Sequence, residues 1–406
     1  MIKNFARVAL VWAASQLTGY TTAAWAVPTL QPAGDEVVLE ILPVITRTRP
    51  AALNASTKST SPQPADPAAA ALAARQDIQL ARQTGETRHW GRAQAQLSPW
   101  WNRANAPPDI AILQTTVQQG RHEFEAARKL LTATLTRAPG HAQGWLNLAA
   151  LERLSARYPQ ALAACEQVAR AGQALHARAC YLETVSLQGQ HVSALQGLGA
   201  LVKSTSDLGL QSWLLSLLAE SQERAGHDAA AAEAYQRSLK LEPDLYTAIA
   251  WSDLLLRTGQ NEQALKVLAS LPETDAVLLR RARAWKQLGD GRWRDTLAVL
   301  KERTAELTRR GDDPSLHGRE LALAALWLDD DAAHALSLAR SNLLLQREPL
   351  DWWVAVQSAT QARDGAALNE IAGAIRTAGL QDVRLALRAA PVTATKTAKA
   401  QALKSQ

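Results

Sequence analysis

The cysteines and histidines are the residues of this 406-residue chain whose types lend themselves most readily to chemistry. Metal ligation and nucleophilic catalysis both need several such side chains at suitable spacings. The sequence contains no Gly-x-Ser-x-Gly elbow, no His-Glu-x-x-His pair and no phosphate-binding glycine-rich loop. The eight histidines are scattered: His89, His122, His141, His176, His191, His227, His317 and His334. We therefore predict a protein that has no catalytic residue set, no metal site and no cofactor.

The first 26 residues have the three parts of a secretory signal peptide. Lys3 and Arg7 give a positive start, Val8–Leu17 is a short apolar stretch, and Ala24–Ala26 matches the small-x-small cleavage pattern. We expect cleavage after Ala26 and a periplasmic or secreted protein. The alternatives are an uncleaved anchor and a chance apolar start. No later run reaches about 18 uninterrupted apolar residues, so no transmembrane segment is expected after cleavage.

Cys165 and Cys180 are the two cysteines of the chain. In an exported protein an even number of cysteines favours a disulfide. Their separation suits the reach from one helix to the next in an antiparallel pair. Closing a loop of this length stabilises a fold by about 3 kcal/mol in the chain-entropy model. We predict a Cys165–Cys180 disulfide, and the alternative is a pair of small buried thiols.

The charge balance is mildly basic. The formal net charge is +6, and loss of Lys3 and Arg7 leaves about +4 (6 − 2). This balance does not imply a nucleic-acid partner. The most basic run, 280–311, could attract an acidic segment or an anionic lipid surface. The alternative for that run is a solvated helix face.

Composition divides the chain into four parts. After the signal peptide, residues 27–67 form an extended arm with one apolar burst, Val37–Leu42, and then a flexible linker rich in Pro, Ser and Thr. Residues 68–387 carry apolar residues at spacings of three and four, which predicts helices nearly throughout. Residues 388–406 are expected to be a disordered, weakly basic tail.

A small residue followed four positions later by a larger one recurs along the helical part. A small side chain lets two helix backbones approach closely, and a larger one fills the wider gap. The pairs are Ala127 with Leu131, Ala161 with Cys165, Ala194 with Leu198, Ala231 with Tyr235, and Ala264 with Leu268. The first members lie 34 (161 − 127), 33 (194 − 161) and 33 (264 − 231) residues apart. A helical bundle with accidental spacing would have to explain these near-equal periods.

This pattern resembles the tetratricopeptide repeat, a helix-turn-helix unit of about 34 residues. The matching residues are Trp145, Leu148, Ala149, Tyr158 and Ala161 in one unit, and Leu218, Ala219, Gly226, Ala231, Tyr235 and Pro243 in another. The resemblance implies an all-α, right-handed α-solenoid of eight to nine stacked units. The units at about 275–312 and 317–349 fit less well, and their helices are expected to be longer.

In such a solenoid the first helix of each unit lines a concave groove. Helical phase places eleven residues on the inner wall: Gln143, Arg153, Glu183, Trp213, Glu220, Glu223, Tyr246, Asp253, Arg257, Arg283 and Lys286. Aromatic and arginine side chains beside carboxylates suit an extended peptide or a partner helix. The alternative for each residue is a solvated groove wall.

The resemblance implies a non-enzymatic exported scaffold that binds a protein or peptide partner in its groove. The segments SPWW, RHEFEAARKLL and GLQDVRLALRA are similar to a set associated with membrane proteins of the nickel-permease type, which makes an inner-membrane protein one candidate partner. The alternative function is a periplasmic carrier of a small or polymeric ligand, such as a glycan or a metal complex.

Overall fold

The protein is described here by a computed structural model that covers residues 66–311 and 313–385. The regular elements in these ranges are helices, without a strand among them. The predicted signal peptide, nearly all of the predicted arm and linker, and the predicted tail lie outside these ranges. Among the described residues, no helix combines the length and apolarity needed to cross a bilayer.

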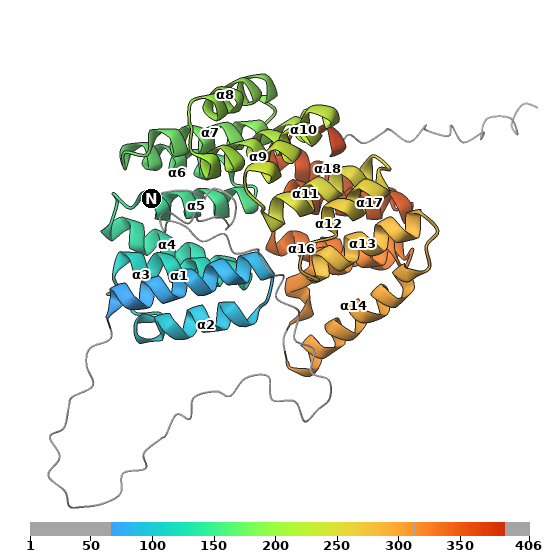
Figure 1. The fold of residues 1–406 in the computed structure, drawn as a ribbon, viewed down its shortest axis with the longest axis horizontal. Coiled ribbons are helices and arrows are strands. Elements are labelled where there is room, and N and C mark those ends of the chain that lie inside the picture. The colour runs from blue at the N-terminus through green and yellow to red at the C-terminus, as the bar shows by residue number, and fades with distance from the viewer. Residues whose placement is uncertain (1–65, 312, 386–406) are drawn as a thin grey trace, which may run out of the picture.

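Eighteen α-helices follow one another along the described chain (Figure 1). They are α1 (Pro67–Thr84), α2 (Arg88–Leu97), α3 (Pro108–Gly120), α4 (Phe124–Arg137), α5 (Ala142–Leu154), α6 (Tyr158–Arg170), α7 (Ala174–Leu187), α8 (His191–Lys203), α9 (Leu208–Arg224), α10 (Asp228–Leu241), α11 (Leu245–Arg257), α12 (Asn261–Leu268), α13 (Asp275–Gln287), α14 (Arg292–Arg309), α15 (Gly318–Trp327), α16 (Ala332–Leu345), α17 (Pro349–Gln361) and α18 (Gly365–Ala378). Three short 3-10 helices accompany them: η1 (Ser98–Trp100), η2 (Pro314–His317) and η3 (Val383–Leu385).

Consecutive helices pack as hairpins, from α1 with α2 to α17 with α18. Each hairpin also contacts the next, so neighbouring units bury each other's apolar faces. This arrangement confirms the predicted all-α solenoid of stacked helix-turn-helix units. The expectation of longer helices at 275–349 holds for α14, which extends over 18 residues. It is wrong for the unit at 317–349, because α15 has 10 residues and α16 has 14.

A left-handed residue closes the turn inside most hairpins. In the α9/α10 turn, Gly226 has φ +82° and the N–H of His227 donates to the carbonyl of Gln222 at 2.9 Å. In the α11/α12 turn, Gly259 has φ +77° and Gln260 donates to Leu255 at 2.8 Å. These six-to-one bonds satisfy carbonyls that the helix end leaves unpaired. In other turns, residues other than glycine adopt the same left-handed backbone conformation: His122, Ala156, Asp330 and Arg363.

The small-then-large pattern has the packing role expected of it. Ala219 on α9 and Ala231 on α10 are fully buried where the two helices meet, and Tyr235 is fully buried beside them. The backbones can approach because alanine adds little bulk, and Tyr235 fills the space farther along. In α14, by contrast, Leu300 is the buried residue.

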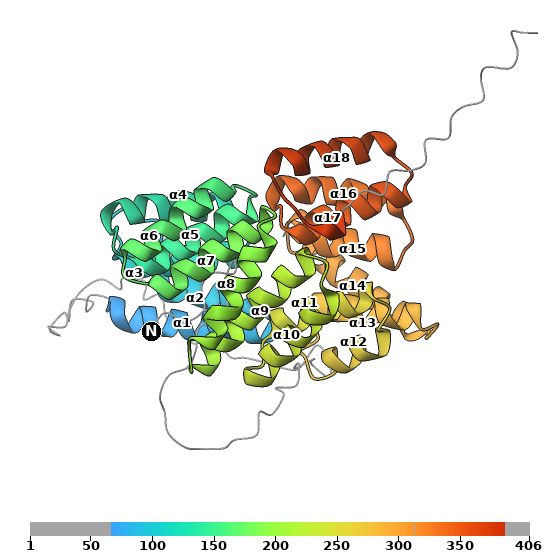
Figure 2. The same cartoon turned by 90° about the horizontal axis from the view of Figure 1, so that it is seen from above.

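The C-terminal hairpins turn back onto the middle of the chain (Figure 2). The N–H of Arg347 donates to the carbonyl of Leu154 at the end of α5, at 2.7 Å. The N–H of Gln381 donates to the carbonyl of Leu187 at the end of α7, at 2.8 Å. Tyr158 belongs to the same buried cluster as residues of α15 to α18. The C-terminal hairpins therefore pack against the C-terminal ends of the first helices α5 and α7.

Cys165 of α6 and Cys180 of α7 are joined by a disulfide, with their Cα atoms 5.6 Å apart. Both residues are buried, at 2% and 0% exposure. The bond links two consecutive hairpins.

Candidate functional site

Charged residues recur at one position of four consecutive first helices. The position is five residues before the C-cap, and the C-caps of α7, α9, α11 and α13 are Gln188, Ala225, Thr258 and Leu288. The residues at this position, which we name the charged row, are Glu183, Glu220, Asp253 and Arg283. All four belong to the inner wall predicted from helical phase.

Glu183 and Asp253 of the charged row are ion-paired within the chain. Glu183 contacts Arg153 at 2.9 Å, and the two side chains are only 9% and 6% exposed. Asp253 accepts two hydrogen bonds from Arg280, at 2.7 and 2.8 Å, and stays 21% exposed. Arg153 and Glu183 would have to be uncovered before a partner could reach them, whereas Asp253 is accessible as the structure stands.

Glu220 contacts Arg224, one helical turn farther along α9, at 3.7 Å. Its side chain is 19% exposed, while that of Arg224 is 3% exposed. Gln143 on α5 is buried and donates to Asn147 at 2.8 Å. Of the two predicted wall residues Gln143 and Glu220, Glu220 is thus the accessible one.

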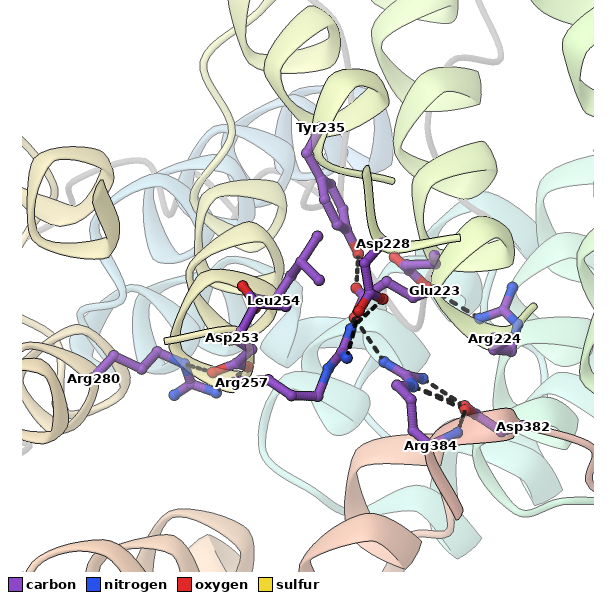
Figure 3. Close-up of polar contacts among 12 residues, drawn as sticks. Glu223, Arg224, Asp228, Tyr235, Asp253, Leu254, Arg257, Arg280, Asp382 and Arg384 are labelled. Atoms are coloured by element: carbon purple, nitrogen blue, oxygen red, sulfur yellow. Dashed lines mark hydrogen bonds and ion pairs between the residues drawn. The ribbon is translucent and has the colours of Figure 1, made fainter. Parts of the chain in front are cut away.

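Glu223 gathers contacts from three directions (Figure 3). Its Oε1 accepts from the hydroxyl of Tyr235 at 2.7 Å. Its Oε2 accepts from Arg257 at 3.2 Å and from Arg384 at 3.0 Å. Arg257 also donates to Asp228 at 2.6 and 2.9 Å. Because Glu223 is 4% exposed, these partners replace the water that a carboxylate needs.

Burial and neighbouring charges shift the pKa of three members of the cluster around Glu223. Burial raises the pKa of Tyr235 well above its ordinary value, and the Glu223 charge adds to the effect. Burial lowers the pKa of Arg384, but Asp382 and Glu223 outweigh it and the pKa ends above its ordinary value. The hydrogen bond from Arg257 lowers the pKa of Asp228. Tyr235 is therefore a permanent donor and Arg384 a permanent cation.

Arg283 and Lys286 of α13 contact the turn that follows α15. Lys286 donates to the carbonyl of Leu328 at 2.9 Å and to Asp330 at 2.7 Å. Arg283 donates to the carbonyl of Trp327 at 3.4 Å and lies over its ring at 5.9 Å. Burial lowers the pKa of Arg283, and Asp330 opposes this in part. Both predicted wall cations thus stabilise a contact between hairpins.

The two predicted aromatic anchors differ in position. Trp213 is 3% exposed, and its ring stacks on His176 with centroids 5.7 Å apart. It belongs to the core shared by α5 to α9. Tyr246, near the start of α11, is partly exposed. A partner-binding role for either residue remains a prediction, and Trp213 offers little surface for it.

Asp382 and Arg384 complete the cluster and were not predicted. They form an ion pair with each other, and Arg384 reaches Glu223 across 161 residues of sequence. Helical phase within the first helices cannot reveal a contact of this range. The available signal is a charged pair that follows the helix stop at Gly379.

Within the described ranges, no group of three His, Cys, Asp or Glu side chains lies close enough to hold a metal ion.

Comparison with known proteins gives structural likeness without a sequence family. No family model matches the chain, and no curated protein matches it. Pseudomonas aeruginosa PilF is similar over 50% of this chain and 90% of its own, at 20% identity and TM-score 0.35. The TPR domain of P58(IPK) is similar over 77% and 95%, at 13% identity and TM-score 0.23. Yeast Tom70 is similar over 78% and 86%, at 11% identity and TM-score 0.24.

The hairpins of this chain define the class of protein directly. Their stacking, their left-handed turns and their small-then-large packing make the chain an α-solenoid of the tetratricopeptide type.

Proposed function

We propose that this chain is a non-enzymatic scaffold that binds a protein or peptide partner in the concave groove of its first helices. The observation that carries the proposal is the charged row at Glu220, Asp253 and Arg283, which repeats on three consecutive first helices. First helices that pack directly, such as α11 and α13, lie about 8–10 Å apart. An extended chain advances about 3.4 Å per residue, so partner residues three apart would meet Asp253 and Arg283. A partner with cations toward Glu220 and Asp253 and an anion toward Arg283 fits best.

The proposed location is the periplasm, near a membrane complex. The signal-peptide features of residues 1–26 support it, and the disulfide suits an oxidising compartment. Mass measurement of the protein from fractionated cells tests the location. An N-terminus at Val27 in the periplasmic fraction is expected, and an intact Met1 in the cytoplasm would overturn it.

Photo-crosslinking in the cell envelope tests partner binding. A photoreactive residue in place of Tyr246 lies about two helical turns before Asp253 on α11. One in place of Val192 (72% exposed, on the second helix α8) is the control. We expect one protein to be captured from position 246 and not from position 192. The capture should fall when Glu220 and Asp253 are both changed to lysine. Capture that is equal from both positions, or absent from both, would contradict the proposal.

Thermal unfolding of the purified chain distinguishes the scaffold from the alternative function, a carrier of a small or polymeric ligand. A glycan or metal ion that binds only the folded state raises the melting temperature. The scaffold proposal expects no such rise with oligosaccharides or divalent metal ions. Burial of Trp213 removes one aromatic side chain that a carrier groove would use.

A further inference from the structure

Residues Leu380–Leu385, which we name the C-terminal segment, cross two turns that lie far back in the chain. The N–H of Gln381 donates to the carbonyl of Leu187, the last residue of α7. A Cβ placed on Gly189 would lie 2.9 Å from the Gln381 side chain, and one placed on Gly226 would lie 3.1 Å from Val383. The segment therefore lies directly against the α7/α8 and α9/α10 turns.

Two leucines and one arginine anchor the C-terminal segment. Leu380 is 3% exposed and Leu385 is 6% exposed, and both share a buried cluster with Leu187 of α7. Val383, between them, is 48% exposed. Arg384 supplies the ion pair to Glu223 at 3.0 Å. Buried and exposed side chains thus alternate from Leu380 to Val383, and the 3-10 helix η3 (Val383–Leu385) then brings Leu385 back to the surface.

The surface beneath the segment offers a buried carboxylate to Arg384. Glu223 is 5% exposed at its side chain and lies 3.0 Å from the Arg384 guanidinium, and its other cationic partner is Arg257, which is shared with Asp228. Arg384 also pairs with Asp382 of the segment itself. Because Glu223 is buried, removal of Arg384 without a replacement is unfavourable, so the surface selects for arginine.

We propose that Glu223, Asp228 and Arg257 form an arginine socket for a short segment of a partner protein, and that the C-terminal segment is its resident occupant. The partner segment carries an arginine followed by an apolar residue, with a second apolar residue four positions before the arginine, as in Leu380, Arg384 and Leu385. A partner that offers this pattern displaces the resident segment. The inference rests on the proposed function, since it names the chemistry of one partner segment.

The resident segment competes strongly because it is tethered. A tethered ligand has an effective concentration on the order of millimolar, so a free peptide meets a socket that is already occupied. Undocking the tethered copy exposes the socket and strengthens the apparent binding of a free copy. The docked and the undocked state of the segment can therefore be compared in the full-length chain, without truncation.

The probe is a fluorescent peptide with the sequence of residues 379–386, GLQDVRLA, and the measurement is fluorescence anisotropy. The test variant Arg384→Glu places an acid against Glu223 and undocks the resident segment. The control variant Arg376→Glu makes the same charge change on the exposed face of α18. We expect the test variant to bind the probe about tenfold more tightly than the wild type and the control. A probe with glutamate in place of its arginine should not bind.

Equal affinity of all three chains for the probe, or no binding to the test variant while its helical circular dichroism is intact, would overturn the inference. If Arg384→Glu does not fold, Arg384→Gln removes the charge without repulsion and should shift the affinity in the same direction by a smaller factor. Partner capture from position 246 without probe binding overturns only the socket. Probe binding without any captured partner counts against the proposed function instead.

Discussion

The hairpins α9/α10 and α13/α14 use the same two positions with opposite charge. Five and two residues before the C-cap, α9 has Glu220 and Glu223, whereas α13 has Arg283 and Lys286. In both hairpins the residue nearer the cap holds a segment from later in the chain. Glu223 holds Arg384, and Lys286 holds the carbonyl of Leu328 with Asp330. In these two hairpins the last turn of the first helix binds a later segment of the chain, through a carboxylate on α9 and an ammonium group on α13.

The second helices of these hairpins differ in burial. On α10 the residues Ala231, Ala234, Tyr235 and Ser238 are buried, whereas on α14 the buried residue is Leu300. The alanines let α10 approach α9 closely. The arginine-rich α14 contacts α13 on one side and remains largely solvated elsewhere, with Val299 45% exposed.

The largest expected effect comes from truncating the buried side chain of each second helix. Tyr235→Ala removes a fully buried ring together with the donor to Glu223, and we expect a loss of about 4 kcal/mol. Leu300→Ala should cost about 2 kcal/mol, because solvent and mobile side chains can fill the site beside α14. Urea denaturation of the two variants measures the difference. Equal losses of unfolding free energy in the two variants would contradict the difference in packing between α10 and α14.

The α3/α4 turn differs from the glycine-containing turns, because His122 holds the left-handed backbone conformation in it, with φ +61°. The pKa of His122 is lowered from 6.5 to about 4, mainly by burial; Glu320 opposes the shift, and His317 and Arg319 add to it. The unfolded state therefore binds the proton more readily, so stability should fall as pH drops from about 6.5 to about 4. The loss is at most about 3 kcal/mol, since one pKa unit corresponds to about 1.4 kcal/mol.

The control for this pH effect is His122→Asn, since asparagine tolerates the same backbone conformation without titrating. Unfolding free energies of both chains are measured at pH 7 and pH 4.5. The wild type should lose more stability than the variant between the two. Parallel losses would show that His122 does not contribute.

Two glycine substitutions separate backbone strain from the docked C-terminal segment. Gly259→Ala meets no atom within 4 Å, so its cost is the left-handed backbone alone, about 1 kcal/mol. Gly226→Ala adds a Cβ 3.1 Å from Val383, and we expect about 2 kcal/mol in total. Thermal or urea unfolding gives both values. If Gly226→Ala costs no more than Gly259→Ala, the segment does not press on the turn.

The smallest expected effect is a gain. Arg363 is exposed and holds φ +56° in the α17/α18 turn, where the regular hairpins have glycine. Arg363→Gly should stabilise the chain by about 1 kcal/mol, since it removes the strain of a left-handed side-chain residue. A lower melting temperature for this variant would contradict that reading of the turns.

Local patterns in the sequence suffice to predict the hairpins. The spacing of Ala231 and Tyr235 predicts the packing of α10 on α9, because helix contacts repeat at fixed spacing within a unit. Helical phase also identifies Glu220 and Asp253 as partly exposed residues at the same position of their helices. It places Trp213 on the same wall, although the ring packs between first helices, since phase alone does not distinguish a groove from the next repeat. The contact of Arg384 with Glu223 depends on how the five hairpins from α9/α10 to α17/α18 accumulate twist, which no local spacing encodes.

Hydrogen–deuterium exchange of the wild-type chain tests the docking of the C-terminal segment most directly. The amide of Gln381 donates to Leu187, so exchange in a peptide spanning residues 380–385 should be slowed and should become fast in Arg384→Glu. Complete exchange of this peptide in the wild type at the earliest time point would contradict the account.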